Sequence, residues 1–435
     1  MTAFFYNTLL LLYKSGIRVA ALWNSKARQW VKGRKDIFEQ IDGHLTSIDQ
    51  PITWVHCSSL GEFEQGRPVI EKLRSLDPDC KILLTFFSPS GYEVRKDFAG
   101  VDWVFYLPID SRSNAKRFID IIRPQLAIFI KYDYWYHYLN ECKKRNIPLV
   151  MVSALFRREQ PFFRWYGSLH RKMLNCFSHF FVQDKESADL LNSVGLANVT
   201  ISGDTRFDRV AEIANSFKPI DDIEKFCGHA QVLVAGSTWP ADEKIIKEAI
   251  ADFPNLKIII APHEIHEKHL VQLKQFFPDS AFYSQFTCFA PLAMTTDLLP
   301  VSPARSHNGE SRAACLIIDN IGMLSRLYHY ATITYIGGGF DKGIHNALEA
   351  AVYGKPVLFG PNYKKFNEAI GLIATGGGIS IRSANDLRAE IKDLLTDPKK
   401  LANISKRSSD FVKQNQGATE KIMNKIQEKR RFTNW

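Results

Sequence analysis

The chain has 435 residues, of which 45% are hydrophobic and 12% aromatic, so it is neither intrinsically disordered nor collagen-like. Its formal net charge is +10, but residues 1–35 contain seven Lys or Arg and no Asp or Glu, which leaves +3 for the other 400 residues. This distribution argues against a protein that is basic throughout, such as a nucleic-acid coat. The length predicts two domains, because a single core rarely grows beyond about 250–300 residues.

The cysteines give no sign of a disulfide framework. There are seven of them, widely scattered, and no C-x-x-C pair occurs. This usage is typical of buried thiols in a reducing compartment and does not indicate a structural zinc site.

The first predicted element is the basic leader, residues 1–35. Its apolar run at residues 4–13 (FFYNTLLLLY) is too short to span roughly 30 Å of hydrocarbon unaided. Positive charge follows this run, whereas a secretory signal carries it in front. We expect an amphipathic helix in the interface of an anionic membrane, on its cytoplasmic side; the alternative is an ordinary helix packed on its own domain. The basic residues that would meet headgroups include Lys14, Arg18, Lys26, Arg28 and Lys32.

From residue 52 onward, short apolar runs alternate with amphipathic stretches, which is typical of a doubly wound α/β fold with buried parallel strands. The strands expected in the first half are residues 52–57, 81–86, 103–107, 126–130, 148–153 and 179–183, and helices are expected at 65–75, 112–122 and 135–144.

The same pattern restarts after a boundary near residues 205–225 and predicts a second α/β half. Its expected strands are residues 232–236, 257–261, 314–318, 332–336 and 356–359. Residues 290–312 are predicted to form a loop, and residues 398–431 to form two closing helices.

Ligands of open α/β sheets bind outside the carboxyl ends of the strands, so the loops there are where chemistry is expected. After the first strand, residues 56–61 (HCSSLG) lead into a helix that begins near Glu62. A carboxylate in that place is a candidate general base for a hydroxyl, or it merely complements the positive end of the helix. The second strand ends in a similar turn, SPSG at 88–91, which either binds an anion or simply caps a helix.

The strongest signal lies at residues 336–361, where a strand runs into three glycines and then a helix that we expect to include His345. Glycines let backbone N–H groups face a phosphate, although a tight turn would also explain them. Asn346 and Glu349 are expected to share one face of the first helical turn and are candidates for binding a nucleotide's sugar and base edge. The order is not G-x-G-x-x-G, so a dinucleotide is not expected.

Three further loops follow strands of the second half and are expected to converge on the same site. They are residues 236–239, 262–264 and 321–323. His263 and His266 form an H-x-x-H pair, but without a third ligand this spacing is more often incidental, and no metal site is expected.

Taken together, these motifs resemble those of bacterial 3-deoxy-D-manno-octulosonic acid (Kdo) transferases, over about residues 52–420. The resemblance rests on the order and spacing of SLGE (59–62), SPSG (88–91), YLP (106–108), GDTRFD (203–208), STWPADE (237–243), GIHNALE (343–349), GPN (360–362) and NQGA (415–418).

The chain departs from the family pattern at several positions. The family's E-T-E-x-W-P-N element reads KYDYWYH at residues 131–137, so its second acid is kept only as Asp133. His263 stands where the family has an Arg, and Gly339 stands where it has a Ser. We expect these changes to alter details of donor and acceptor contact within the same reaction.

The resemblance implies a fold and a reaction. The implied fold is GT-B, with two Rossmann-like doubly wound domains facing across a cleft. Residues 1–35 would be the membrane-associating segment, 36–210 the acceptor domain and 211–435 the CMP-Kdo-binding domain, with the last helices closing on the first half. The implied reaction is an inverting, metal-independent transfer of Kdo from CMP-Kdo to a lipid A precursor, without a cofactor, at the cytoplasmic face of the bacterial inner membrane.

The resemblance also implies roles for individual residues. Glu62 would take the proton of the acceptor hydroxyl, while Asp133 and Arg206 would support the transition state. The implied donor-binding residues are Ser237, Thr238, Pro262, His263, Ile321, Gly322, Met323, Gly338, Gly339, Lys342, Asn346, Ala347, Leu348 and Glu349. The implied acceptor-binding residues are Ser58, Ser59, Gly61, Ser88, Ser90 and Gly91.

Two other hypotheses remain open from the sequence. One keeps the fold and changes the substrate, giving a UDP-sugar transferase or a sugar-nucleotide epimerase. The other is a non-enzymatic, membrane-bound nucleotide- or nucleic-acid-binding protein. The near-neutral body argues against a nucleic-acid partner.

Overall fold

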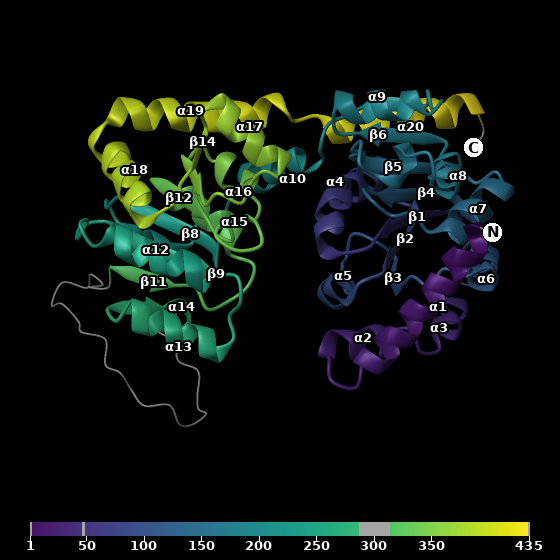
Figure 1. Cartoon of the computed structure of the whole chain (residues 1–435), viewed down its shortest axis with the longest axis horizontal. Helices are drawn as coiled ribbons and strands as arrows, with labels where there is room; N and C mark the ends of the chain where they lie inside the picture. The colour runs from purple at the N-terminus through teal and green to yellow at the C-terminus, as the bar shows by residue number, and fades with distance from the viewer. Residues whose placement is uncertain (1, 46–47, 287–313, 434–435) are drawn as a thin grey trace. The chain divides into compact units, whose positions relative to one another are not determined.

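The computed structural model describes residues 2–45, 48–286 and 314–433. The chain forms two compact units (Figure 1). The amino-terminal unit comprises Met1–Arg209 and Asn415–Trp435, and the carboxy-terminal unit comprises Val210–Gln414. Among the described residues, each unit holds one seven-stranded parallel sheet, which confirms the predicted α/β class.

The amino-terminal sheet has the strand order β3-β2-β1-β4-β5-β6-β7. Its strands are β1 (Ile52–Cys57), β2 (Lys81–Phe86), β3 (Trp103–Tyr106), β4 (Pro124–Ile130), β5 (Leu149–Ala154), β6 (His179–Val182) and β7 (Val199–Ile201). Every residue of β1 is buried, as expected of a strand covered on both faces. Strand β1 pairs with both β2 and β4. Successive strands are therefore added on one side of β1 up to β3, and on its other side from β4 onward, so that the strand order reverses between β1 and β4.

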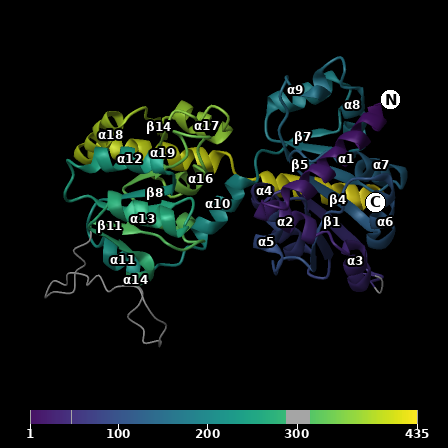
Figure 2. The same cartoon turned by 60° about the horizontal axis from the view of Figure 1, so that its bottom comes forward.

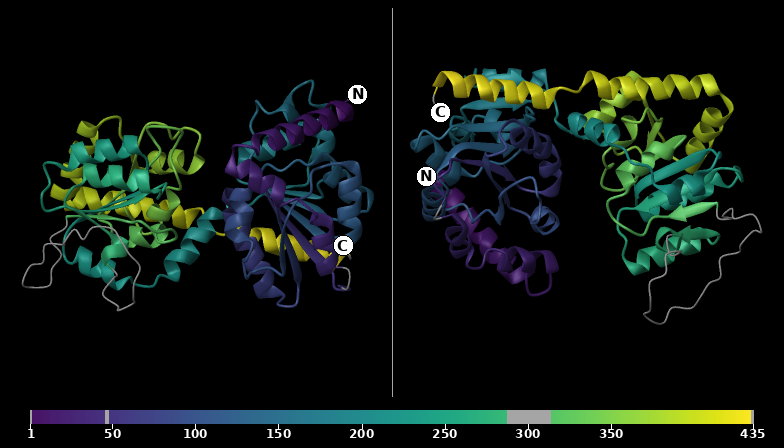
Figure 3. Two further views of the ribbon diagram at one scale, coloured as in Figure 1. Left: turned by 90° about the horizontal axis from the view of Figure 1, so that it is seen from below. Right: turned by 180° about the vertical axis from the view of Figure 1, so that it is seen from behind.

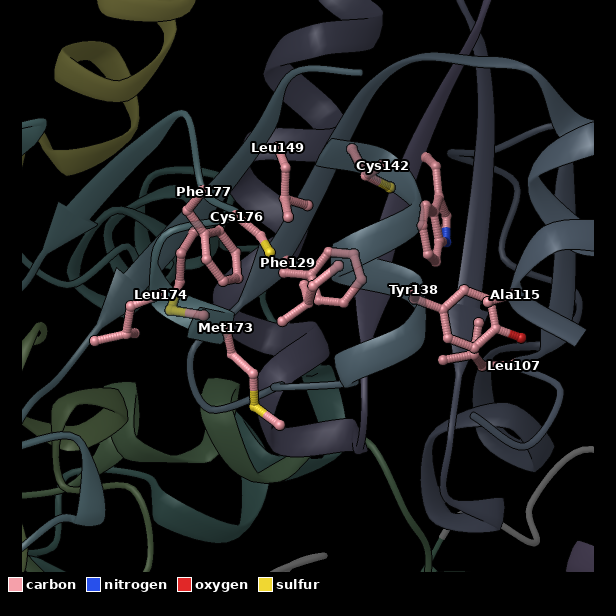
Figure 4. Packing of buried hydrophobic residues seen from close by; sticks show 14 of the residues in the cluster. Leu107, Ala115, Phe129, Tyr138, Cys142, Leu149, Met173, Leu174, Cys176 and Phe177 are labelled. Atoms are coloured by element: carbon pink, nitrogen blue, oxygen red, sulfur yellow. The ribbon is translucent and has the colours of Figure 1, made fainter. Parts of the chain in front are cut away.

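Helices cover both faces of this sheet. On one face, Trp54 of β1 packs against Phe129 of β4 and against Phe118 and Tyr138 of two helices. Figure 4 shows Phe129 and Tyr138 in this core. The helices of the unit are α1 (Thr2–Ala20), α2 (Ser25–Lys32), α3 (Ile37–Leu45), α4 (Leu60–Leu76), α5 (Pro89–Arg95), α6 (Arg112–Ile122), α7 (Tyr136–Lys144), η1 (Pro161–Phe163), α8 (Ser168–Leu174), α9 (Lys185–Ser193) and α20 (Ala418–Thr433). Helices α4 and α20 pack on the other face.

Helix α1 lies on the outside of the amino-terminal unit (Figures 2 and 3). Only a narrow stripe of it is partly buried, and most of its large apolar side chains are exposed. Within the described part of the chain, no helix has both the length and the apolar character that a membrane span requires.

The carboxy-terminal sheet repeats the plan with the order β10-β11-β9-β8-β12-β13-β14. Its strands are β8 (Val232–Thr238), β9 (Lys257–Pro262), β10 (Ser280–Phe282), β11 (Cys315–Ile317), β12 (Ile333–Ile336), β13 (Val357–Phe359) and β14 (Gly378–Ser380). Its growth reverses between β8 and β12, since β8 pairs with both β9 and β12.

The helices that belong with this second sheet include long ones and single turns. They are α10 (Arg206–Asn215), α11 (Asp221–Cys227), α12 (Pro240–Ile250), α13 (Glu267–Phe276), α14 (Tyr283–Phe286), α15 (Leu324–Leu327), η2 (Tyr328–Tyr330), α16 (Leu348–Ala351), α17 (Asn367–Thr375), α18 (Ala384–Thr396) and α19 (Pro398–Gln414). Helix α10 begins in the amino-terminal unit and crosses the boundary.

The structure corrects the predicted elements in three places. Strands β7, β10 and β14 were not predicted, because three residues at a sheet edge are too few to show a periodicity. Helix α4 begins at Leu60, five residues before the predicted start at residue 65. The predicted loop at 290–312 lies outside the described residues, whereas the two closing helices are confirmed as α19 and α20.

The third correction concerns the glycine-rich segment. Helix α16 begins at Leu348, so His345 and Asn346 precede it and do not belong to its first turn. Asn346 instead accepts a hydrogen bond on Oδ1 from the Leu348 N–H at 3.2 Å. Asn346, which was expected inside the helix, therefore lies before it and accepts from its first N–H.

Candidate active site

The candidate residues gather at the two points where the sheets reverse their growth. In the amino-terminal unit the loops after β1 and β4 carry residues 58–62 and Asp133. In the carboxy-terminal unit the loops after β8 and β12 carry residues 237–239 and 337–342. Ligands of doubly wound sheets bind at these places, because the loops diverge there and leave a crevice at the carboxyl ends of the strands.

Glu62 lies in the first turn of α4 and is half-buried. The Ser59 hydroxyl donates a hydrogen bond to its Oε2 at 2.7 Å, which fixes the direction of the carboxylate. Gly61 is exposed, and nothing but the Ser59 hydroxyl approaches the position of a side chain there. The arrangement leaves an oriented carboxylate with open space beside it.

Asp133 approaches the same serine pair from the loop after β4. Its side chain is buried, its Oδ2 accepts the Ser58 N–H at 3.0 Å, and its Oδ1 is hydrogen-bonded to the Ser58 hydroxyl. Ser58 and Ser59 therefore hold one carboxyl group each, and the two acids flank the end of β1.

The two acids have different electrostatic surroundings. Burial, reinforced by the charge of Glu62, raises the pKa of Asp133 well above its usual range. His56 Nε2 lies 3.5 Å from Asp133 Oδ2, but burial lowers the pKa of His56 to about 3, so this imidazole is neutral. Its Nε2 accepts the Trp135 indole N–H at 3.1 Å. Asp133 is thus more readily protonated than an ordinary carboxyl group, and both of its oxygens are hydrogen-bonded to Ser58.

Arg206 stands at the start of α10 and is tied to α4. Its Nε and Nη2 donate to Asp204 Oδ2 at 3.0 and 2.8 Å. Although burial opposes it, the charge and hydrogen bonds of Arg206 lower the pKa of Asp204. The Gln65 amide, three residues after Glu62, donates to Asp204 Oδ1 at 3.1 Å. Helix α4, which carries Glu62, and the Arg206 guanidinium are thus connected through Asp204.

The predicted acceptor residues of the second loop lie beside the first. The Ser88 N–H donates to the Ser58 carbonyl at 2.7 Å. The hydroxyls of Ser88 and Ser90 are 2.9 Å apart, and Ser88 caps α5 through the Ser90 N–H. Gly91 is required by packing, because a Cβ there would lie 2.2 Å from the Phe86 ring.

In the carboxy-terminal unit the glycine loop packs against the end of β8. A Cβ on Gly337 would lie 2.3 Å from the Ser237 carbonyl oxygen, and a Cβ on Gly339 would lie 2.5 Å from the Gly360 nitrogen. Gly338 has a φ of +89°, which a side chain would strain. All three glycines are therefore explained by close backbone approach.

Asp242 joins the two loops and was missed in the sequence. Its Oδ2 accepts the Gly338 N–H at 2.8 Å and the Trp239 N–H at 2.9 Å, and its Oδ1 accepts the Tyr335 hydroxyl at 2.7 Å. One carboxylate thus determines how the glycine loop lies against the loop after β8. Its place in the first turn of α12 was the available signal.

Three rings form a stack over these loops. His263 lies between Trp239 and His345, with ring centroids 4.8 and 4.2 Å away. The Trp239 indole N–H also donates to His345 Nε2 at 3.1 Å, and the Lys342 ammonium lies 6.0 Å from the Trp239 ring. Burial, with the charge of His263, lowers the pKa of His345 to about 4, so its ring is neutral. The exposed face of the stack is polar and aromatic.

The remaining predicted donor residues differ in what they can offer. Asn346 Nδ2 donates to Glu349 Oε1 at 2.9 Å, so these two side chains meet as predicted. Three of these residues are fully buried, so only their backbone atoms can contact a ligand. They are Thr238, Ala347 and Leu348.

The loop after β11 offers one exposed residue. Ile321 is 86% exposed, whereas Met323 is buried. Gly322 between them has a φ of +98°. Pro262 is buried, whereas the next residue, His263, is exposed. Within the described residues, no group of three or more His, Cys, Asp or Glu side chains is arranged to hold a metal ion.

Known proteins resemble this chain in sequence and in fold. Residues 31–209 match the family model described as 3-deoxy-D-manno-octulosonic-acid transferase (kdotransferase). The 3-deoxy-D-manno-octulosonic acid transferase of Rickettsia typhi is 25% identical over 393 residues, which cover 87% of this chain and 80% of that protein. The protein of the same description from Haemophilus influenzae is 23% identical over 441 residues, with 97% of each chain covered.

Solved structures agree in fold. A UDP-GlcNAc 2-epimerase from Neisseria meningitidis bound to UDP-GlcNAc has a TM-score of 0.62 at 14% identity and covers 87% of this chain and 100% of its own. A putative UDP-N-acetylglucosamine 2-epimerase from Listeria monocytogenes has a TM-score of 0.60 at 12% identity, covering 89% and 98%. At these identities the likeness concerns the fold, two Rossmann-like domains of the GT-B type.

The fold is of the GT-B type, and the sequence matches to Kdo transferases indicate a glycosyltransferase. Within this class the resemblance to the Kdo transferase family is confirmed, and the amino-terminal unit carries that family's domain.

Proposed function

We propose that the chain transfers Kdo from CMP-Kdo to a sugar hydroxyl of a lipid A precursor during lipopolysaccharide synthesis. The observation that carries the proposal is the serine pair at the end of β1, which binds Glu62 on one side and Asp133 on the other. It lies inside the part of the chain that matches Kdo transferases. An inverting transfer needs one base for the acceptor, and Glu62 fits this role, because it is oriented and accessible.

The proposed reaction is a single displacement. Glu62 removes the proton of the acceptor hydroxyl, and the oxygen attacks the anomeric carbon of Kdo. The bond from that carbon to the CMP phosphate oxygen breaks, and CMP leaves with the bonding electron pair. Arg206 supplies the cation for the departing phosphate or the Kdo carboxylate. The raised pKa of Asp133 favours its protonated form, which would reduce the negative charge beside Glu62.

The donor is proposed to bind in the carboxy-terminal unit. The glycine loop would lie against the CMP phosphate, with Lys342 supplying positive charge, because the N–H groups of Gly337 and Gly338 are already bonded to Gly236 and Asp242. Asn346 and Glu349 present an amide and a carboxylate side by side, which suits ribose hydroxyls and the cytosine edge. His263 stands where the family has an Arg, and we propose that its imidazole lies beside the donor. A nucleoside monophosphate leaves with less charge than a diphosphate, so we propose that the reaction needs no metal ion.

The leader is proposed to attach the enzyme to the cytoplasmic face of the inner membrane. Its apolar side chains are exposed although the helix is folded against the unit, and basic residues follow them. The exposed apolar residues are Phe4, Phe5, Leu9, Leu11, Leu12, Tyr13, Val19, Leu22 and Trp23. This position would present the active site to a lipid acceptor.

The test is incubation with CMP-Kdo and a tetraacylated lipid A precursor, comparing the wild type with Glu62→Gln. We expect kcat/KM to fall by about 10²–10⁴-fold, the usual contribution of a general base. Glu71→Gln on the same helix, whose carboxylate pairs with Arg67, is the matched control and should keep its activity. A wild type that turns over UDP-GlcNAc and not CMP-Kdo would establish the alternative donor and refute the proposal.

A further inference from the structure

The leader helix contacts the body of the enzyme through two tyrosines. The Tyr6 hydroxyl donates to Asp110 Oδ2 at 2.5 Å and accepts the Tyr136 N–H at 3.3 Å. The neighbouring Asn7 Oδ1 lies 2.7 Å from His137 Nε2. Polar groups of α1 are thus bonded to the first turn of α7.

Asp110 completes this contact from the loop after β3. Its Oδ2 accepts the His137 N–H and its Oδ1 accepts the Tyr138 N–H, both at 3.1 Å. The amino terminus of α7 is therefore capped by a buried carboxylate, which the Tyr6 hydroxyl in turn holds in place. Without Tyr6 the Tyr136 N–H would lose its acceptor.

A second contact runs through aromatic rings. Tyr13 of α1 and Trp30 of α2 both pack on Phe87, with ring centroids 6.1 and 5.8 Å away. Phe87 packs on Trp135 at 4.4 Å, and the Trp135 indole donates to His56 beside Asp133. One contact from the leader thus ends in the first turn of α7, and the other ends at Trp135, the last residue of the loop before that helix.

That loop joins β4 to α7 and consists of residues 131–135. It begins with Lys131 at a φ of +62°, a strained conformation for a residue with a side chain. It carries Asp133 in its middle, and its far end is the segment that the leader contacts. Strained loops keep their shape only when the surrounding contacts impose it.

We propose that the leader helix is part of the catalytic apparatus: Tyr6 and Tyr13 are positioning residues that keep the 131–135 loop, and so Asp133, in place beside Glu62. This inference rests on the proposed function. It gives residues 1–20 a second role besides membrane attachment, so that loss of leader contacts slows transfer to an acceptor in solution.

The test compares Tyr6→Phe with Thr8→Val in detergent solution, with CMP-Kdo and a short-chain acceptor. Tyr6→Phe removes the hydroxyl that bonds Asp110, whereas Thr8→Val removes an exposed hydroxyl that bonds only Phe4 of its own helix. We expect kcat to fall about three- to tenfold for Tyr6→Phe, the equivalent of one lost hydrogen bond, with KM for CMP-Kdo unchanged. Thr8→Val should keep the wild-type kcat.

A double-mutant cycle separates positioning from a general loss of stability. If Tyr6 acts through Asp133, Tyr6→Phe should cost nothing further in an Asp133→Asn background. The proposal would be overturned if Tyr6→Phe lowered kcat by the same factor in the wild type and in Asp133→Asn. It would also be overturned if Tyr6→Phe kept the wild-type kcat.

Hydrogen exchange tests the structural part without any activity. Amides of residues 131–138 should exchange faster in Tyr6→Phe than in the wild type and Thr8→Val, and unchanged exchange would overturn the proposal. An inactive wild type with faster exchange in Tyr6→Phe would refute the proposed function and leave the contact between leader and loop established.

Discussion

Asp133 and His56 are buried and lie 3.5 Å apart, yet they form no ion pair at neutral pH. His56 is fully enclosed, and the Trp135 indole N–H already occupies its Nε2. His269 and Glu243 show the opposite outcome. Both carboxylate oxygens of Glu243 lie within 3.1 Å of His269 Nε2, and this hydrogen bond raises the pKa of the imidazole. At the residue scale, the hydrogen bonds that remain after burial decide which groups carry charge.

The His269 pair predicts a pH dependence of stability. The hydrogen bond to Glu243, against the effect of burial, raises the pKa of His269 above its ordinary value of 6.5. The stabilisation is therefore complete below that value and is lost as pH rises through the pKa of the folded state. His269→Gln should lower the free energy of unfolding by on the order of 1 kcal/mol more at about pH 6 than at about pH 8.5.

The measurement is urea unfolding of both proteins at the two pH values. His229→Gln, at an exposed position in the same unit, is the control and should show no such difference. Equal losses at both pH values for His269→Gln would show that the pair is not charged in the folded protein.

At the scale of elements, α1 combines a stripe that packs on its unit with a wide face of exposed apolar side chains. Its contacts with the unit run through Tyr6 and Tyr13, while Leu9 and Leu12 are 66% and 63% exposed. The sequence predicted the apolar and basic character of this segment but could not assign its faces, because the apolar residues lie nearly all around it. The alternative that the helix packs on its own domain is thus correct for one stripe of α1.

We expect the exposed stripe to decide membrane binding. Leu9→Ser combined with Leu12→Ser should lower the fraction bound to phosphatidylglycerol-containing vesicles by about tenfold or more, since each buried leucine contributes roughly 1.5–3 kcal/mol. Flotation of the vesicles measures it. Leu76→Ser changes an exposed leucine of α4 and should bind as the wild type does. Unchanged flotation of the double variant would refute membrane binding through this stripe.

At the scale of the whole molecule, the chain leaves the amino-terminal unit after Arg209 and returns to it at Asn415. The return is held by Asp208, whose carboxylate accepts the Gly417 N–H at 2.6 Å and both the N–H and hydroxyl of Thr419 at 2.7 Å. Helix α20 then buries Ile422 on the sheet face shared with α4. The last helix is therefore part of the first unit's core.

Asp208→Asn should weaken the attachment of residues 417–419 to the amino-terminal unit. The three donors lose a charged acceptor, so we expect the free energy of unfolding of the amino-terminal unit to fall by about 1–3 kcal/mol. Urea unfolding measures the free energy of unfolding, and hydrogen exchange of the α20 amides measures the protection of that helix. Asp410→Asn, which removes an exposed carboxylate of α19, should change neither. Unchanged protection of α20 in Asp208→Asn would show that the helix is held by its apolar contacts.

The sequence by itself determined the fold class, the two-sheet organisation and the family resemblance, because buried strands, small-residue loops and motif spacing are carried by residues close together in the chain. Only the tertiary structure decided the chemistry of the site. The contact of Ser58 with Asp133 joins residues 75 positions apart, and that of Tyr6 with Tyr136 joins residues 130 apart. Burial, the neutral His56 and the support of the Asp133 loop depend on such contacts, which no local pattern encodes.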